Sequence, residues 1–399
     1  MFESHSQRQR ERMDAILELI LNEKMITRTK LAGALKMSSS SIVKYLKILI
    51  DTGLVRESEQ VLATGGRRSV LLEFNPEMGL NIALVLDATK VTGALINAAG
   101  SVMGIECAPV RRGMPREELL SVLFTVADSL AARAAGEKKK VFGVGIGIGG
   151  FIDLAGGISR TYLFAAGWYD VPLKAIMEKR LGIPCFLLKD VNAFALGEKY
   201  FGDGIGVSNF LSVWLGDGIG MGIVANGGLC TGAQSHAGEL GHTQAPGSDA
   251  LCYCGHRGCL ETITSQGYVL EKCREGLRQG VQSDMRKECG GRVEELTMAH
   301  VITAANAGDR LARNILEEVA QHIGRGLSDV VTVMNPSLII LRGPLIDGNR
   351  FLYENIRRII LNGTLQETAA ELRITYAEHG EDIRLKGLSA YIIREYFIR

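Results

Sequence analysis

Four side chains that favour soft metal ions lie within one short segment of the sequence. They follow the spacing His-x9-Cys-x-Cys-x4-Cys, and they are His242, Cys252, Cys254 and Cys259. Thiolates and an imidazole suit tetrahedral zinc, and four protein ligands leave no open coordination position. The pattern therefore predicts a structural zinc, for which His236 and His256 are rival ligands. The alternative is a loop of reduced cysteines in which His242 only forms hydrogen bonds.

Three carboxylates stand where they could bind a small molecule. Glu239 and Glu261 flank the metal cluster, and we expect the zinc loop to hold them at the mouth of a pocket. Asp190 follows an apolar strand predicted over 184–188 and precedes a helix, which is the position where α/β sheets bind ligands. It could deprotonate a hydroxyl or accept its hydrogen bond, whereas the plain alternative is a helix cap.

The N-terminal segment, residues 1–75, has the pattern of a winged helix-turn-helix. Apolar residues recur at helical spacing in three short stretches between 13 and 50, and a tight turn at 36–37 separates the last two. Two short strands then surround the sequence Gly65-Gly66-Arg67-Arg68, which predicts a wing. The alternative is a three-helix interaction module with a solvated, charged face.

The start of the third helix and the wing supply hydroxyls and cations of the kind that bind phosphates and base edges. The predicted DNA-binding residues are Ser38, Ser39, Ser40, Ser41, Lys44, Tyr45, Arg67 and Arg68. The charge distribution agrees, because residues 1–70 hold twelve Lys and Arg against eight Asp and Glu, whereas the remainder has a net charge of −3.

The composition describes a globular protein. The 399 residues are 46% hydrophobic with a net charge of +1, so the overall charge does not mark the chain as a binder of nucleic acid or membranes. The N-terminus lacks a signal-peptide pattern, and no apolar run reaches the length of a membrane span. We therefore expect a cytoplasmic protein, in which clustered cysteines indicate metal rather than disulfides.

From residue 76 onward, short apolar strands and helices alternate in two similar series. Strands over 82–86, 91–97 and 101–108 predict an antiparallel meander. We expect an α/β body with two lobes and a ligand cleft between them. The expected domains are a DNA-binding head over 1–75, a first lobe over 76–200 and a second lobe over 201–399, and the final helix, 383–399, is a candidate to pack back on the first lobe.

Together these motifs resemble the ROK family of transcriptional regulators, in which a winged helix-turn-helix precedes a sugar-kinase-like domain. The resemblance covers about residues 10–399. It is carried by Glu239-Leu240-Gly241-His242, the cysteine loop ending in Cys259-Leu260-Glu261, Gly65-Gly66-Arg67-Arg68, Gly167-Trp168 and Asp190-Val191-Asn192-Ala193. It implies an actin-like, ribonuclease-H-like fold for the body.

The resemblance also implies roles for single residues. In this family the residue matching Asp190 is the catalytic base of the kinases and a sugar ligand of the regulators. The residues matching Glu239, His242 and Glu261 bind sugar hydroxyls, and the four members of the metal cluster match the family's zinc ligands. Lys189 joins the predicted ligand set, although the kinases and many regulators have an asparagine there. A cation at this position suits an anionic sugar derivative, or it neutralises a nearby carboxylate.

Three departures from the family's kinases argue against phosphoryl transfer. Their Asp-x-Gly-x-Thr loop matches Asp87-Ala88-Thr89-Lys90, which lacks the glycine that lets backbone N–H groups close on a phosphate. Their Gly-Thr-Gly-x-Gly matches Gly216-Asp217-Gly218-Ile219-Gly220, where a carboxylate adds repulsion. Their Gly-Gly pair matches Arg342-Gly343. We therefore expect sugar binding without catalytic residues.

The sequence as a whole predicts a sugar-responsive DNA-binding regulator, a repressor of carbohydrate-utilisation genes with a structural zinc. Its expected partners are a double-stranded DNA operator, a sugar or sugar-derivative effector, and copies of itself in a homodimer or homotetramer, with no membrane span. Two other classes stay open. One is an active ATP-dependent sugar kinase with an accessory DNA-binding head, for which Asp190 is the base. The other is a regulator steered by a protein partner, with a vestigial pocket.

Overall fold

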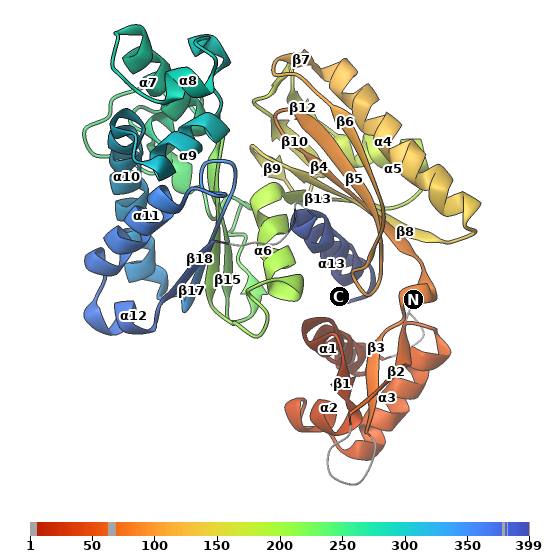
Figure 1. Ribbon diagram of the computed structural model, residues 1–399. Coiled ribbons are helices and arrows are strands. Elements are labelled where there is room, and N and C mark those ends of the chain that lie inside the picture. The colour runs from red at the N-terminus through yellow and green to blue at the C-terminus, as the bar shows by residue number, and fades with distance from the viewer. Residues whose placement is uncertain (1–5, 63–68, 377–379, 381, 399) are drawn as a thin grey trace. The chain divides into compact units, whose positions relative to one another are not determined.

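The computed structural model describes residues 6–62, 69–376, 380 and 382–398. The chain forms two compact units (Figure 1). The first comprises Met1–Gly206 and His379–Arg399, and the second comprises Val207–Glu378. Each unit has its own five-stranded sheet and its own hydrophobic core.

The head of the first unit contains the three predicted helices and the two predicted strands. The elements are α1 (Gln7–Glu23), β1 (Ile26–Thr27), α2 (Arg28–Ala34), α3 (Ser39–Asp51), β2 (Val55–Leu62) and β3 (Ser69–Phe74). Hydroxyl caps start the last two helices, because Thr27 accepts a hydrogen bond from the N–H of Lys30 and Ser38 accepts one from the N–H of Ser41. Strand β3 lies between β1 and β2 in an antiparallel sheet.

A five-stranded sheet organises the rest of the first unit. Its order is β13-β8-β4-β5-β6, in which β4, β8 and β13 run parallel and β5 runs antiparallel to both β4 and β6. The strands are β4 (Leu80–Leu86), β5 (Lys90–Asn97), β6 (Val102–Pro109), β8 (Val141–Ile148) and β13 (Cys185–Lys189). The antiparallel meander predicted from the sequence is thus confirmed.

Helices cover both faces of this sheet (Figure 1). Helix α4 (Arg116–Gly136) packs on one face, where Gly93 of β5 leaves room for Val126 and Leu130. This helix is long and apolar enough to cross a membrane by length and composition alone, but its apolar stripe is buried on the sheet. Helices α6 (Asp190–Phe201) and α13 (Ile383–Phe397) lie together on the other face, where Leu388 meets β8.

The last helix returns to the first unit and crosses α6 with no side chain between the two backbones. The crossing positions are Gly197 in α6 and Gly387 in α13. A Cβ on Gly387 would lie 1.9 Å from the carbonyl oxygen of Ala193, and a Cβ on Gly197 would lie 2.1 Å from that of Ile383. The two helices therefore form one tightly packed pair.

Short strands extend the first unit beyond the end of β8. They are β7 (Met114–Pro115), β9 (Ile152–Asp153), β10 (Ile158–Thr161), β11 (Ala165–Ala166) and β12 (Tyr169–Val171), followed by α5 (Leu173–Leu181). After β8 the chain turns at Gly150, whose φ of 83° is a left-handed conformation that favours glycine. A Cβ on Gly150 would lie 2.1 Å from the carbonyl oxygen of Thr161. The turn therefore brings the end of β10 against the end of β8.

The second unit also consists of a five-stranded sheet and helices. Its sheet has the order β16-β15-β14-β17-β18, with β14 (Phe210–Leu215), β15 (Ile219–Ala225), β16 (Gly228–Leu229), β17 (Leu338–Arg342) and β18 (Arg373–Tyr376). Its helices are α7 (Gln266–Arg278), α8 (Met285–Glu288), α9 (Met298–Ala307), α10 (Arg310–Met334), α11 (Arg350–Gly363) and α12 (Gln366–Glu371). Helix α10 is central, because it packs against α7, α9 and α11 and buries Leu316, Ile323 and Leu327 completely.

The fold class predicted from the sequence is confirmed, with local differences. The sequence analysis did not predict α11, α12 or β18. Helix α7 begins at Gln266, because Leu260–Ile263 form a 3-10 turn and Ser265 caps the helix that follows. The division into three domains with boundaries after residues 75 and 200 remains a prediction, since the structure separates the two units given above.

We predict that Gly387→Ala destabilises the protein, because the added methyl group would overlap the carbonyl of Ala193. Overpacking of this kind costs about 1–3 kcal/mol, which urea and thermal unfolding would measure. Gly267→Ala is the matched control, since Gly267 lies in helix α7 with no atom within 4 Å of its Cβ position. That substitution should leave stability unchanged or raise it slightly. Equal stability of Gly387→Ala and the wild type would contradict the close crossing.

Candidate ligand, metal and DNA sites

Asp190 lies at the carboxyl end of the parallel strands of the first unit. Strand β13 ends at Lys189, and α6 begins with Asp190, whose Oδ1 accepts a hydrogen bond from the N–H of Val191 at 2.9 Å. The other oxygen, Oδ2, lies beside the turn after β8, where a Cβ on Gly149 would stand 3.8 Å away. Because only Oδ1 makes the cap contact, Asp190 can cap the helix and still present an acceptor to a ligand.

A partly buried ion pair stands near Asp190. Two nitrogens of Arg384 in α13 donate to the two carboxylate oxygens of Asp87, at 2.7 and 2.9 Å. Burial raises the pKa of Asp190, and Asp87 reinforces this rise, whereas Arg384 and Lys189 act against it. Lys189 is itself buried. The sequence analysis missed Arg384, because 297 residues separate it from Asp87 and no local pattern joins the two.

The predicted metal ligands come together in the second unit. The ligand atoms of His242, Cys252, Cys254 and Cys259 all lie within 4.8 Å of one another. The Sγ atom of Cys252 is 3.6 Å from Nδ1 of His242, and the Sγ atoms of Cys254 and Cys259 are also 3.6 Å apart. Two sulfur atoms on one tetrahedral zinc are about 3.8 Å apart, so the cluster fits a metal ion.

The two rival histidines differ in position. The Nδ1 atom of His256 lies 3.5 Å from Sγ of Cys254, so it remains close to the cluster. His236 does not belong to the group of four that the described residues form. Two 3-10 turns, η2 (Leu240–His242) and η3 (Leu260–Ile263), begin and end the loop, and the N–H of Leu260 donates to the carbonyl of Thr243 at 2.8 Å. The loop is thus closed by its own backbone.

Two predicted ligand carboxylates border this cluster. Nε2 of His242 is 3.9 Å from a carboxylate oxygen of Glu239, and Nδ1 is 3.8 Å from one of Glu261. Burial raises the pKa of Glu261, while His242 acts against the rise and Glu239 adds to it. The Nε2 atom of His242 is also 3.0 Å from the hydroxyl of Tyr253. The sequence analysis missed this tyrosine, although it stands between two of the cysteines.

The turn at Gly216-Asp217-Gly218, which matches a glycine-rich motif of the family's kinases, lies against Glu261. The carboxylate accepts a hydrogen bond from the backbone of Ile219, and a Cβ on Gly218 would stand 3.8 Å from Oε2. Asp217 belongs to the same turn, between β14 and β15. Arg342, at the end of β17, is buried, and its Nε lies 3.7 Å from a carboxylate oxygen of Asp347.

The serines at the start of α3 differ in what their hydroxyls do. Ser39, Ser40 and Lys44 are exposed. The hydroxyl of Ser38 caps α3 and lies 3.1 Å from Oγ of Ser40 and 2.9 Å from Oγ of Ser41. Ser39 and Lys44 are therefore the more available DNA contacts of this set.

One predicted DNA contact needs correction. Tyr45 is only 5% exposed, and the guanidinium of Arg12 lies 6.0 Å from the centre of its ring. Its ring therefore belongs to the core of the head. The prediction was wrong because helical spacing alone did not show which side of α3 this residue occupies. Arg67 and Arg68 lie outside the described residues, so their DNA contacts remain a prediction.

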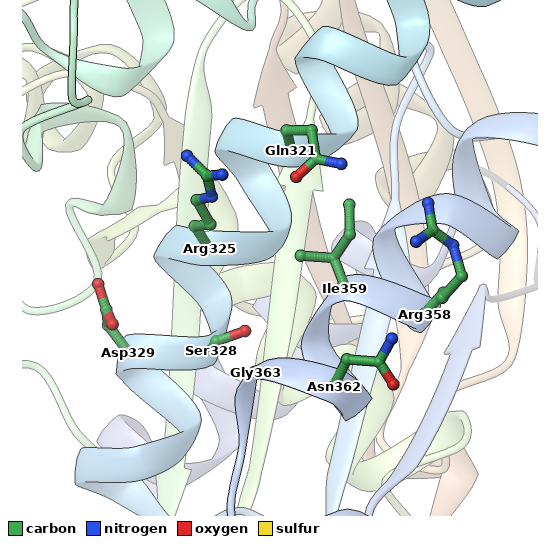
Figure 2. A pocket seen from close by; sticks show the side chains of 8 residues that line it. All are labelled: Gln321, Arg325, Ser328, Asp329, Arg358, Ile359, Asn362 and Gly363. Atoms are coloured by element: carbon green, nitrogen blue, oxygen red, sulfur yellow. The ribbon is translucent and has the colours of Figure 1, made fainter.

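A surface pocket of about 390 Å³ lies elsewhere in the second unit, between α10 and α11 (Figure 2). It is lined by Gln321, Arg325, Ser328, Asp329, Arg358, Ile359, Asn362 and Gly363. Figure 2 shows the two arginines at its two sides, with Ile359 between them. None of the predicted ligand or metal residues lines it, so it adds nothing to the predicted site.

We predict that Asp190→Asn raises the stability of the ligand-free protein at neutral pH. Burial raises the pKa of Asp190 and so disfavours its charged form. The resulting cost is absent below the unfolded pKa of the carboxyl group, grows as the pH rises from there toward the raised folded pKa, and is constant above it. Melting temperatures of the two proteins from about pH 5 to about pH 8 should therefore diverge as the pH rises.

Asp153→Asn is the control with the opposite sign. A hydrogen bond from the N–H of Gly156 lowers the pKa of Asp153, although burial opposes it, and Arg160 lowers the pKa further. Its charged form therefore contributes stability above its unfolded pKa, and this contribution is lost as the pH falls. An Asp190→Asn protein that is less stable than the wild type at neutral pH would contradict the buried position of Asp190.

Comparison with known sequences gives consistent matches over nearly the whole chain. The sequence profile of the ROK family matches residues 81–395. A xylose repressor from Caldicellulosiruptor bescii is 31% identical over 382 residues, which make up 95% of this chain and 94% of the relative. The DNA-binding transcriptional dual regulator NagC of Escherichia coli (strain K12) is 26% identical over 369 residues, which make up 91% of this chain and 88% of that one.

Solved structures share the same architecture. A ROK family transcriptional regulator, described as a homolog of the E. coli MLC protein, matches with a TM-score of 0.83 over 98% of both chains, and its 24% identity limits that likeness to the fold. A ROK family glucokinase from Streptomyces griseus, solved with glucose and AMPPNP, is 26% identical with a TM-score of 0.69, over 78% of this chain and 99% of that one. As its motifs predicted, the chain belongs to the ROK family.

Proposed function

We propose that the chain is a carbohydrate-responsive transcriptional regulator that acts as a repressor. The observation that carries this proposal is the helix-turn-helix of α2 and α3 on the same chain as a ROK body, over a length that a xylose repressor matches almost completely. The match to NagC has a similar extent. A kinase gains nothing from such a head, whereas a regulator needs one to reach DNA.

The proposed effector is a sugar. In the first unit Asp190 and Lys189, and in the second unit Glu239, His242 and Glu261, are the residues proposed to contact it. Carboxylates and an imidazole form directional hydrogen bonds with hydroxyls. Lys189 acts against the rise in the pKa of Asp190, which supports an ion pair between the two. A lysine whose charge is balanced by Asp190 does not call for an anionic ligand, so we propose an uncharged effector. The name of the xylose repressor supports the class of ligand without identifying the sugar.

We propose that phosphoryl transfer is absent. That reaction depends on positioned metal ions and on groups that neutralise phosphate charge. Both carboxylate oxygens of Asp87 are engaged by Arg384, and Asp217 places a carboxylate in the turn at Gly216-Asp217-Gly218. The likeness to the glucokinase favours the alternative of an active sugar kinase. An ATP-dependent phosphorylation assay separates the two, because turnover that Asp190→Asn abolishes would establish the kinase.

We propose that the helix pair α6 and α13 transmits effector binding to the head. Asp190 begins α6, and near the other ends of the two helices lie contacts with the head. The guanidinium of Arg394 is 3.9 Å from the carboxylate of Glu18, and Nζ of Lys24 is 5.0 Å from the centre of the Phe201 ring. A shift at Asp190 would therefore displace residues that contact α1, provided that the effector binds the two states with different affinities.

The proposed DNA partner is a near-palindromic operator. A homodimer or homotetramer would place two heads on half-sites about 34–36 Å apart or at multiples of that spacing. The linker between head and lobe is anchored to the head, because Nδ2 of Asn75 donates to the carbonyl of Gly53 at 3.0 Å. We place this activity in the cytoplasm, where operator DNA is accessible in bacteria.

The metal cluster is proposed to hold zinc as a structural brace. One imidazole and three thiols are a complete tetrahedral set, so no position is left for substrate. With the ion bound to Nδ1 of His242, the imidazole would keep its orientation toward Glu239 and Tyr253. The brace would therefore fix the part of the second unit that carries Glu239 and Glu261.

The test of the proposed function is whether a sugar changes operator affinity. Duplexes that the full chain selects from a random pool would be titrated by fluorescence anisotropy, with and without pentoses, hexoses and their phosphates. We expect one uncharged sugar to change the Kd at least about fivefold. Lys44→Ala should weaken DNA binding and reduce its salt slope by about 1, with sugar affinity unchanged. A chain that binds sugar but selects no DNA would refute the regulator.

We predict one zinc per chain in protein purified without chelators. Cys254→Ser removes one ligand and should therefore lower the zinc content, the melting temperature and the affinity for the effector. Atomic emission and calorimetry would measure these quantities. Cys107→Ser is the control, because Cys107 is an exposed cysteine of the first unit. Full zinc content in Cys254→Ser would show that another residue, such as His256, is the ligand.

A further inference from the structure

The side chain of Tyr162 is buried, and its phenol oxygen is the unusual feature. It follows β10 directly, and its side chain is 3% exposed. The ring makes edge contacts with Phe164 at 5.4 Å and with Trp168 at 5.8 Å, measured between ring centres. Trp168 is itself held by a hydrogen bond of 2.9 Å from its Nε1 to Oγ of Ser159. The aromatic packing therefore fixes where the phenol oxygen points.

The phenol oxygen of Tyr162 is buried and has no hydrogen-bond partner among the described residues. Folded proteins rarely leave a buried hydroxyl unpaired, because burial removes its hydrogen bonds to water without replacing them. Tyr200, another buried phenol of this unit, is paired, since it accepts a hydrogen bond from Nζ of Lys199 at 3.1 Å. The unpaired state of Tyr162 thus needs its own explanation.

The turn after β8 connects Tyr162 with Asp190. The carbonyl of Thr161 touches this turn at Gly150, and the N–H of Phe151 donates to Oγ1 of Thr161 at 3.3 Å. On its other side, Gly149 adjoins the carboxylate of Asp190. Thr161 and the carboxylate of Asp190 therefore adjoin two consecutive glycines of one turn.

The charged groups near the phenol include Asp190 of the predicted ligand site. Burial raises the pKa of Tyr162, Asp87 and Asp190 raise it further, and Arg112 and Arg384 act in the opposite direction. Both terminal nitrogens of Arg384 already bind Asp87. What this part of the site offers a ligand is thus a neutral phenol beside the Asp190 carboxylate.

We propose that the hydroxyl of Tyr162 is a further effector contact, which hydrogen-bonds an uncharged hydroxyl group of the carbohydrate next to Asp190. The proposal rests on the proposed sugar-binding function. A phenol both donates and accepts, whereas a carboxylate only accepts, so the two groups together suit the hydroxyls of a sugar. Because aromatic packing holds the phenol in place, the ligand meets a preorganised contact.

Tyr162→Phe tests the proposal, because it removes the oxygen and keeps the ring. The ligand-free variant should be as stable as the wild type or slightly more stable, since no hydrogen bond is lost. Its affinity for the effector, measured by calorimetry with the sugar that binds the wild type, should fall about tenfold. Operator binding without the sugar should not change.

Tyr200→Phe is the matched control. Its phenol is paired with Lys199, so this variant should lose stability and keep its affinity for the sugar. Monodeoxy analogues of the sugar then identify the hydroxyl that Tyr162 meets, because the analogue lacking it should bind wild type and Tyr162→Phe equally well.

Three outcomes would overturn the proposal. Equal sugar affinity of Tyr162→Phe and the wild type would show that the phenol binds only water, and the proposed function would survive. A Tyr162→Phe protein that is less stable without ligand would show that the hydroxyl is already paired. Failure of the wild type to bind any carbohydrate would overturn both the contact and the proposed function.

Discussion

The ion pair between Asp87 and Arg384 joins the beginning and the end of the ROK body. It connects the residue after β4 to the first turn of α13 across 297 residues of sequence. A partly buried pair of this kind stabilises only while both partners remain, because the loss of one leaves an uncompensated charge. It adds to the packing of α13 on α6 and on the sheet, and it sets the charge around Asp190.

Under the proposed function, the contact between Arg384 of α13 and Asp87 has a second consequence. Asp87 stands where the family's kinases begin their phosphate loop, and here a guanidinium binds both of its oxygens. If phosphoryl transfer is absent as proposed, helix α13 would contribute to that loss by engaging Asp87, and with α6 it reaches residues that contact the head. A kinase fold could thus become a sensor by keeping its sugar contacts and by connecting them rigidly to a DNA-binding domain.

Local sequence patterns were sufficient for features whose parts are close in the chain. The four metal-cluster residues could be predicted because they belong to one loop, and the meander because its strands follow one another. Tyr45 shows the limit of such patterns, since helical spacing did not place it in the core of the head. Helix α11 was not predicted, although it is amphipathic and begins after Gly348 and the capping residue Asn349.

The sequence by itself determined the family, the fold class and the residues of the metal cluster, because each depends on residue types at short spacing; the carboxylates at 190, 239 and 261 remain predicted ligand contacts. Only the tertiary structure decided which groups meet Asp190. Arg384 reaches Asp87 from the last helix, and Tyr162 is brought near by a turn at Gly149 and Gly150. These contacts follow from how the chain closes on itself, and a buried side chain acquires its partners only through that packing.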